Sequence, residues 1–216
     1  EAFPAYLESL VASFYERAGL VRLRDGGQGS ITICGSVSPA GGNFEEPVTQ
    51  ATLKVVGSFL ALSRDRANAR RYPAIHPLDS WSKYHSIVPK DKINEARAML
   101  RTGNEVNQMM KVVGEEGTPT SDFVQYLKSE FIDAVYLQQN TFDKVDSGCG
   151  AERQQHVFDK LLDIIRHKFT FPDKDAARSF FQRLRQDFID WNYCPWESDT
   201  FKAGEEKIDS LIKNGK

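Results

Sequence analysis

The sequence has 216 residues, of which 40% are apolar, so it is long enough to bury one sizeable core or two smaller ones. Its 28 basic and 30 acidic residues are spread along the chain and give a net charge of -2, which argues against a nucleic-acid partner. Three widely spaced cysteines and four scattered histidines form no metal-binding motif, and no apolar run is long enough for a signal peptide or a membrane span. We therefore predict reduced thiols in the cytosol, no metal site and no direct insertion into a membrane.

The first 88 residues alternate between helical and strand-like patterns. Helical periodicity covers residues 4–18, 48–56 and 64–71, and short apolar runs typical of strands cover residues 30–37 and 57–62. This alternation is typical of the edge of an α/β sheet.

From Pro89 onward the pattern is helical. Five helices are predicted, at residues 89–114, 119–137, 151–169, 173–191 and 198–214. Thr118 is expected to cap the second of these, with Pro119 at its first helical position. Each helix has a broad apolar stripe, which favours a bundle. We predict an α+β protein, mainly α, with an α/β portion in residues 1–88 and a helical bundle domain in residues 89–216.

Two segments of the α/β portion have compositions that suggest a function. Residues 69–84 read ARRYPAIHPLDSWSKY, which places an aromatic ring, a stiffened turn and short polar groups just after a strand-like run. Open α/β sheets hold ligands at such an edge, and Pro73 favours an extended backbone at Tyr72 that directs its ring away from the sheet edge. Residues 38–50 read SPAGGNFEEPVTQ, a composition typical of an ordered loop that approaches another backbone closely.

Together with LQQNTFDKVD at residues 137–146, these segments make the chain resemble the last part of the catalytic A subunit of V-type and A-type ATPases. The resemblance implies the C-terminal part of a P-loop NTPase nucleotide-binding domain followed by a helical bundle. It also implies a peripheral, cytoplasmic complex that couples ATP hydrolysis or synthesis to rotation and to proton or sodium transport. The implied partners are the non-catalytic B subunit and the central-stalk rotor subunits.

The resemblance assigns an adenine pocket to two aromatic residues. Tyr72 would stack on one side of adenine and Phe142 would line the other side. Gln139 lies beside them, between Gln138 and Asn140, and two roles stay open for these three side chains: hydrogen bonds to the base or sugar, or capping of the helix end.

The sequence lacks the groups that transfer phosphate. Residues 25–30 and 114–118 are rich in glycine, but neither ends in Gly-Lys-Ser/Thr, so both are predicted to be turns. We therefore expect no catalytic residue in this chain and interpret it as an excised C-terminal fragment. ATP or ADP with Mg²⁺ would be the cofactor of the whole subunit, and the fragment alone is expected to be inactive and to bind no nucleotide tightly.

By the same resemblance, two loops are expected to face the rotor or neighbouring subunits. Their candidate interface residues are Pro39, Gly41, Gly42 and Asn43 in the first loop and Glu115 and Glu116 in the second. An ordinary surface loop and a plain helical hairpin are the alternatives.

Two other classes of protein are weighed against this interpretation. A structural helical interaction module, related to the non-catalytic subunit and without nucleotide binding, would not need the two pocket aromatics. Lys83 stands where the non-catalytic subunit has an arginine, and lysine lacks the planar fork of that group. Export ATPases of flagella and secretion systems are disfavoured by the loop at residues 39–50.

Overall fold

The computed structural model describes residues 3–214, and contacts divide the chain into two compact units. The first comprises Glu1–Phe59 and Trp81–Tyr84, and the second comprises Leu60–Ser80 and His85–Lys216. The described part is mainly helical with a few short strands, as predicted. The two units interleave along the chain, so they do not correspond to a single division after residue 88. The predicted domain division there stays a prediction. Within residues 3–214, no helix combines the length and the apolar character that crossing a membrane requires.

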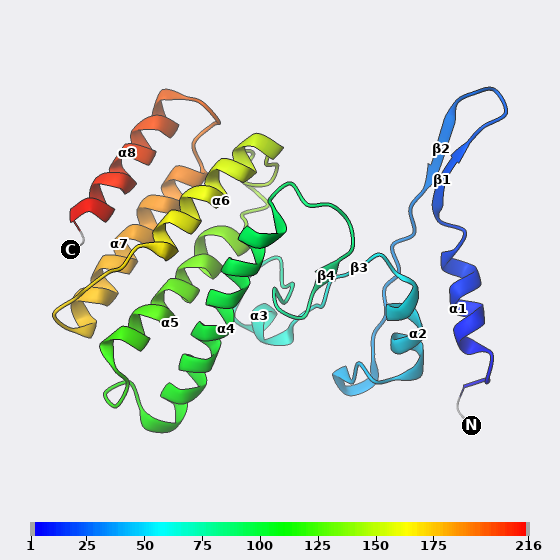
Figure 1. Cartoon of the computed structure of the whole chain (residues 1–216), viewed down its shortest axis with the longest axis horizontal. Helices are drawn as coiled ribbons and strands as arrows, with labels where there is room; N and C mark the ends of the chain where they lie inside the picture. The colour runs from blue at the N-terminus through cyan, green and yellow to red at the C-terminus, as the bar shows by residue number, and fades with distance from the viewer. Residues whose placement is uncertain (1–2, 215–216) are drawn as a thin grey trace. The chain divides into compact units, whose positions relative to one another are not determined.

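The first unit consists of short elements (Figure 1). They are α1 (Leu7–Tyr15), β1 (Gly19–Arg22), β2 (Gln28–Ile31), η1 (Ala40–Gly42), α2 (Pro47–Val55), β3 (Ser58–Phe59) and β4 (Trp81–Ser82). β1 and β2 form an antiparallel hairpin, and β3 pairs with β4. The hairpin turn contains Gly26 at a φ of 87°, which glycine adopts without strain, so the start of the glycine-rich segment 25–30 provides a turn as predicted, whereas Gln28, Gly29 and Ser30 belong to β2.

The strands of this unit are shorter than the apolar runs suggest. The predicted strand at residues 30–37 ends at Ile31, because its partner β1 has only four residues and Gly19 already pairs with Ile31. The predicted strand at residues 57–62 is reduced to β3 and one isolated bridge from Leu62 to Ile75. A strand needs a partner for its backbone groups, and within the described residues the ladder stops where the partner stops.

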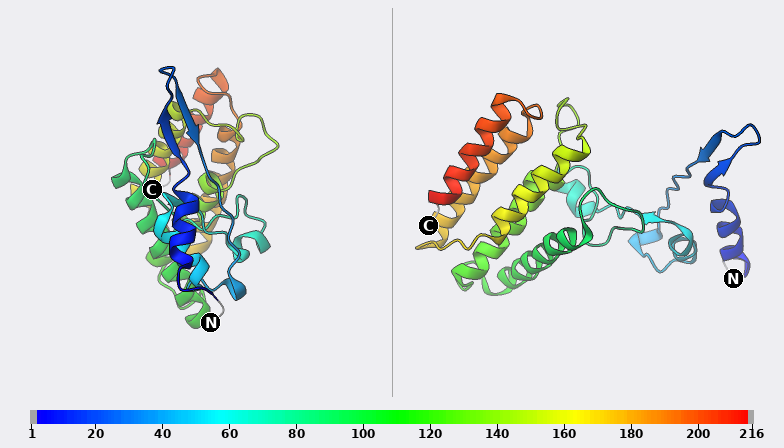
Figure 2. Two further views of the ribbon diagram at one scale, coloured as in Figure 1. Left: turned by 90° about the vertical axis from the view of Figure 1, so that its right-hand side faces the viewer. Right: turned by 45° about the horizontal axis from the view of Figure 1, so that its top comes forward.

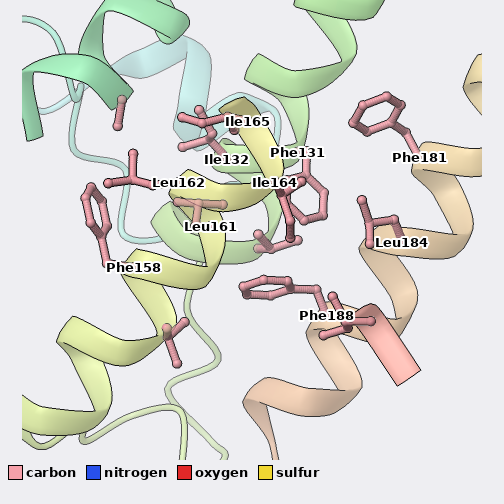
Figure 3. Close-up of a cluster of buried hydrophobic side chains, with 14 of the residues drawn as sticks. Phe131, Ile132, Phe158, Leu161, Leu162, Ile164, Ile165, Phe181, Leu184 and Phe188 are labelled. Atoms are coloured by element: carbon pink, nitrogen blue, oxygen red, sulfur yellow. The ribbon is translucent and has the colours of Figure 1, made fainter. Parts of the chain in front are cut away.

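The second unit contains one short helix and a bundle of long helices, seen from two further directions in Figure 2. Its elements are α3 (Arg64–Asn68), α4 (Lys90–Val113), α5 (Thr120–Ile132), the π-helix η2 (Asp133–Leu137), α6 (Ala151–Arg166), α7 (Lys174–Asn192) and α8 (Asp199–Asn214). α4 packs on α5, α5 on α7 and α7 on α8. Their apolar stripes meet in one core, to which Phe131 of α5, Leu161 of α6 and Leu184 of α7 contribute (Figure 3).

The five long helices agree with the predicted ones, although α6 ends at Arg166 instead of residue 169. The start of α5 and the end of the short helix α3 differ for local reasons. Thr118 does not cap α5, because its hydroxyl donates to the carbonyl of Gly114 at 3.1 Å and the residue is buried. Pro119 is the N-cap residue instead of the first helical residue. α3 ends at Asn68 instead of residue 71, and Arg70 has a φ of 56°, outside the helical region.

The C-terminal end of α5 continues into the π-helix. Its wider turn is closed by the amide of Gln138, which donates to the carbonyl of Asp133 at 3.0 Å, five residues earlier. The chain then leaves the helix, since Gln138 has an extended backbone with φ -88° and ψ 132°. The predicted helix to residue 137 is therefore confirmed in length, and its last turn has a different hydrogen-bond pattern.

Gly103 allows α4 and α5 to approach closely. It is buried in the middle of α4, and a Cβ atom placed on it would lie 2.0 Å from the Cβ of Ser129 on α5. Glycine within a helix costs roughly 1 kcal/mol relative to alanine. The closer packing of α4 against α5 must compensate for that cost.

We predict that Gly103→Ala lowers the free energy of unfolding of the bundle by about 1 to 3 kcal/mol, because the overpacking outweighs the gain in helix propensity. Chemical denaturation followed by circular dichroism measures this change. Adding Ser129→Gly should recover part of the loss, whereas Gly148→Ala, which meets no atom within 4 Å, is the matched control. A stabilising effect of Gly103→Ala alone would contradict the close contact.

Candidate functional site

Tyr72 lies on a loop that begins and ends at one antiparallel contact. The amide of Ser63 donates to the carbonyl of Ala74 at 2.8 Å, and the amide of His76 donates to the carbonyl of Ala61 at 2.7 Å. The Ser63 hydroxyl also caps α3 inside this loop. These bonds close the base of the loop, and Tyr72, two residues before Ala74, lies beside this base with 53% of its surface exposed.

Phe142 lies on a second loop that short polar side chains hold in shape. The Oδ1 atom of Asn140 accepts from the amide of Phe142 at 3.1 Å, and Asp146 accepts from the amide of Asn140 at 2.6 Å. Asp143 accepts from the amides of Val145 and Asp146 at 2.8 and 2.9 Å. Such side-chain bonds to nearby amides fix turns, so Asn140 has a structural role in this loop.

The two loops meet in one hollow. The amide of Gln139 donates to the carbonyl of Tyr72 at 2.9 Å, which joins segments far apart in the sequence. The hollow is lined by Tyr72, Pro73, Gln139, Asn140, Thr141 and Phe142 and has a volume of about 470 Å³. This volume lies within the roughly 300 to 1,000 Å³ of typical ligand pockets. The structure therefore brings together all three residues predicted for the adenine pocket.

The exposure of Phe142 is unusual for an apolar ring. Its side chain is 97% exposed, so it gains almost no stabilisation from packing in the folded chain. A flat apolar surface held out by an ordered loop is suited to stack on a planar ligand or to pack against a partner. Its chemistry matches that of Tyr72, the other exposed ring of the hollow.

A second, more polar hollow adjoins the first. It has a volume of about 260 Å³ and shares Tyr72, Gln139 and Asn140 with its neighbour. Two arginines, Arg70 and Arg185, also line it. Neither arginine could be selected from the sequence, because they lie far apart in the chain and only the fold brings them together.

A partly buried ion cluster supports the loop of Tyr72. Asp133 accepts from Arg66 and Arg71, and Arg71 also donates to Glu130 at 2.7 Å. Burial alone lowers the pKa of Arg71, but hydrogen bonds and charge from Glu130 and Asp133 outweigh this effect and raise it. This cluster was not predicted from the sequence, although an aspartate inside the apolar run FIDAVYL is a signal that its carboxylate needs a partner within the protein.

The predicted interface residues belong to the two units separately. In the first unit, Gly41 and Gly42 have φ values of 65° and 76°, and both are exposed together with Asn43. Pro39 precedes them and is partly buried. The Asn43 side chain accepts from the amide of Glu45 at 3.0 Å, so this loop is ordered.

In the second unit, Glu115 and Glu116 lie exposed in the turn between α4 and α5. Arg178 of α7 forms an ion pair with Glu115, and Lys174 donates to the carbonyl of Glu116 at 3.2 Å. The turn is therefore fastened to α7. Whether either set of residues meets another subunit stays a prediction.

Two family descriptions match the chain in succession. Residues 1–82 match the ATP synthase alpha/beta family, nucleotide-binding domain, and residues 90–178 match the C-terminal domain of V and A type ATP synthase. The chain belongs to the ATP synthase alpha/beta family, and its second match places it in the V and A type.

Curated relatives named V-type ATP synthase alpha chain are similar over essentially the whole chain. The relative from Treponema denticola is 62% identical over 100% of this chain, and the one from Borrelia turicatae is 58% identical over 100%. The alpha chain 1 of Treponema pallidum is 57% identical over 99%. The chain spans 38%, 38% and 36% of the lengths of these relatives, respectively.

A solved structure shares the fold. It is described as a unique ATP synthase subunit NeqB from Nanoarcheaum equitans, and it aligns with a TM-score of 0.62 over 77% of this chain and 41% of that chain. The sequence identity is 24%, so this likeness concerns the fold alone.

We predict that this chain binds adenosine and MgATP no more tightly than the millimolar range, because the hollow offers contacts to the base and no phosphate-binding loop. In an NMR titration, both ligands should shift the amide signals of Tyr72, Gln139 and Phe142. Inorganic triphosphate is the matched ligand without a base and should leave these signals unchanged. Micromolar binding, or metal-dependent ATP turnover by the pure chain, would refute this prediction.

Proposed function

We propose that the chain is part of the catalytic subunit of a rotary V/A-type ATPase and forms the adenine side of its nucleotide site. The whole subunit would couple hydrolysis or synthesis of ATP to transport of protons or sodium ions across a membrane. The complex would be peripheral to that membrane on its cytoplasmic side. Its partners would be the non-catalytic B subunit and the subunits of the central stalk.

The observation that carries this proposal is the shared hollow of Tyr72 and Phe142. Two exposed aromatic rings on separate ordered loops, linked through the Gln139 amide, offer apolar faces for a purine. Base stacking on aromatic side chains contributes about 1 to 3 kcal/mol per base. Similarity to ATP synthase alpha chains makes adenine the base that fits the proposal.

The phosphates and Mg²⁺ would be held by other parts of the subunit. Within residues 3–213 no group of three or more histidine, cysteine, aspartate or glutamate side chains could hold a metal ion. The residues of the hollow fit a planar base, and their aromatic and amide groups are not metal ligands of the kind that Mg²⁺ prefers. The chain would therefore position the base and leave the chemistry to the remaining domain.

A helical interaction module without nucleotide binding is the second candidate function. It is favoured by the exposed turn between α4 and α5, which suits contact with a partner. It gives no reason for an ordered loop that holds Phe142 almost fully exposed. The two functions differ in the expected effect of the aromatic residues on nucleotide affinity.

We predict that Tyr72→Ala in the intact subunit weakens ATP binding by about 1 to 3 kcal/mol, the stacking contribution of one base. Tyr72→Phe should be nearly silent, because the hydroxyl does not stack. Calorimetric or fluorescence titration of the intact subunit with MgATP measures both affinities.

The matched control is Tyr84→Ala, because Tyr84 is an exposed tyrosine like Tyr72 but lines neither hollow. Equal losses from Tyr72→Ala and Tyr72→Phe would mean that Tyr72 acts through its hydroxyl. No loss from Tyr72→Ala would favour the interaction module.

We also propose that the turn between α4 and α5 transmits motion between the bundle and the rotor. Gly114 ends α4 at a φ of 79°, and the buried Thr118 bonds back to it. Lys174 and Arg178 of α7 bond to Glu115, so a force on the turn would act on α4, α5 and α7 together. This arrangement supports a lever whose contribution is its shape.

We predict that replacing residues 115–120 with a Gly/Ser linker in the assembled complex retains ATP turnover and impairs ATP-driven ion pumping. A flexible linker cannot transmit force between the helices as a rigid turn does. Turnover and pumping are measured on the same preparation. The variant Glu116→Gln removes a charge from the turn, keeps its length and the Glu115–Arg178 ion pair, and should pump normally if shape is decisive. Unchanged rates with the linker would make the turn a connector.

A further inference from the structure

Asp133 contacts both segments that form the walls of the hollow. It is 5% exposed and begins the π-helix η2. Its carboxylate accepts from Arg66 and Arg71, and Arg71 is the residue before Tyr72. Its carbonyl accepts from the amide of Gln138 at 3.0 Å, and Gln138 is the residue before Gln139.

These contacts close a ring. From Asp133 the ring runs through the Arg71 ion pair to Tyr72, across the hydrogen bond between the Tyr72 carbonyl and the Gln139 amide, and back through Gln138 to Asp133. One ion pair and two backbone hydrogen bonds thus set the spacing of the two pocket walls. Asp133 is not among the residues that line either hollow, so it would act on a ligand only through its neighbours.

We propose that Asp133 is a positioning residue of the adenine site, an inference that rests on the proposed function of the hollow. Its charge is required because Arg66 is almost buried, with 9% exposure, and two of its nitrogen atoms, Nε and Nη2, find no hydrogen-bond partner among the described residues. Without the carboxylate, the Arg66 guanidinium must move toward water, and Arg66 belongs to α3 in the loop of Tyr72. The loop that carries Tyr72 is then no longer held at a fixed distance from Gln139.

The effect is expected on the adenine part of binding alone. If the aligned arrangement of the two walls falls to about a tenth of the population, the affinity for a ligand that needs both walls falls about tenfold. Inorganic triphosphate carries no base, and its affinity does not depend on the alignment. The ratio of the two affinities separates positioning from a general loss of structure.

The experiment uses the intact subunit with Asp133→Asn, which removes the charge and keeps the size. MgATP should bind about tenfold more weakly and Mg-triphosphate equally well. Asp133→Glu keeps the charge and should recover part of the ATP affinity. The matched control is Asp187→Asn, because Asp187 is 8% exposed and pairs with Lys207 of α8 at 2.7 Å, yet contacts neither loop of the hollow. It should leave both affinities unchanged.

Two further variants make each outcome decisive. If Asp133→Asn does not fold, Glu130→Gln removes only the second partner of Arg71 and should cause a smaller loss, again specific for ATP. Equal losses for ATP and triphosphate, or no loss for either, would overturn the positioning role of Asp133. Tyr72→Ala, measured in parallel, tests the pocket itself: if it leaves the ratio unchanged, the proposed function fails, and if it alone lowers the ratio, only the inference about Asp133 fails.

Discussion

An almost fully buried carboxylate needs cationic partners inside the protein, and Asp133 pairs with two arginines of one loop. Burying an ion is costly unless its partners are held in place, so this pairing forces the loop of residues 61–76 to lie against the end of α5. The loop and the long helices consequently form one compact unit, although the family description that covers the loop is that of the nucleotide-binding domain. The ion cluster is one chemical reason why this segment is held against the long helices, and the bonds from Arg97 of α4 to the carbonyls of Leu78 and Ser80 are another.

The long helices were predictable because their signal is local and repeated. α6, for example, places Val157, Leu161 and Ile165 on one face, and each becomes buried in the core. The strands were not predictable to the same extent, since the length of a strand depends on a partner elsewhere in the chain. The apolar run at residues 30–37 has the composition of a strand, but the four residues of β1 decide where pairing ends.

The site was predictable only where a motif could be matched. Tyr72, Gln139 and Phe142 were selected by resemblance to a family, and the structure places them in one hollow. The residues that hold them in place come from α3, α5 and η2, and sequence spacing gives no indication that Arg66 and Asp133 meet across 67 positions. Long-range ion pairs of this kind depend on the finished packing, which periodicity does not encode.

The π-helix has a consequence for tolerance of insertions and deletions. Its turn contains one residue more than an α-helical turn, and each helical residue rotates the chain by about 100°. A one-residue deletion between Asp133 and Leu137 can therefore be absorbed by a return to the α-helical hydrogen-bond pattern, and the chain beyond it would leave the helix on nearly the same side. An insertion, or a deletion of two residues, leaves a net shift of one residue and would rotate the loop of Phe142 by about 100° relative to Tyr72. Chains that keep the hollow should therefore tolerate a one-residue deletion in this segment better than any other change of its length.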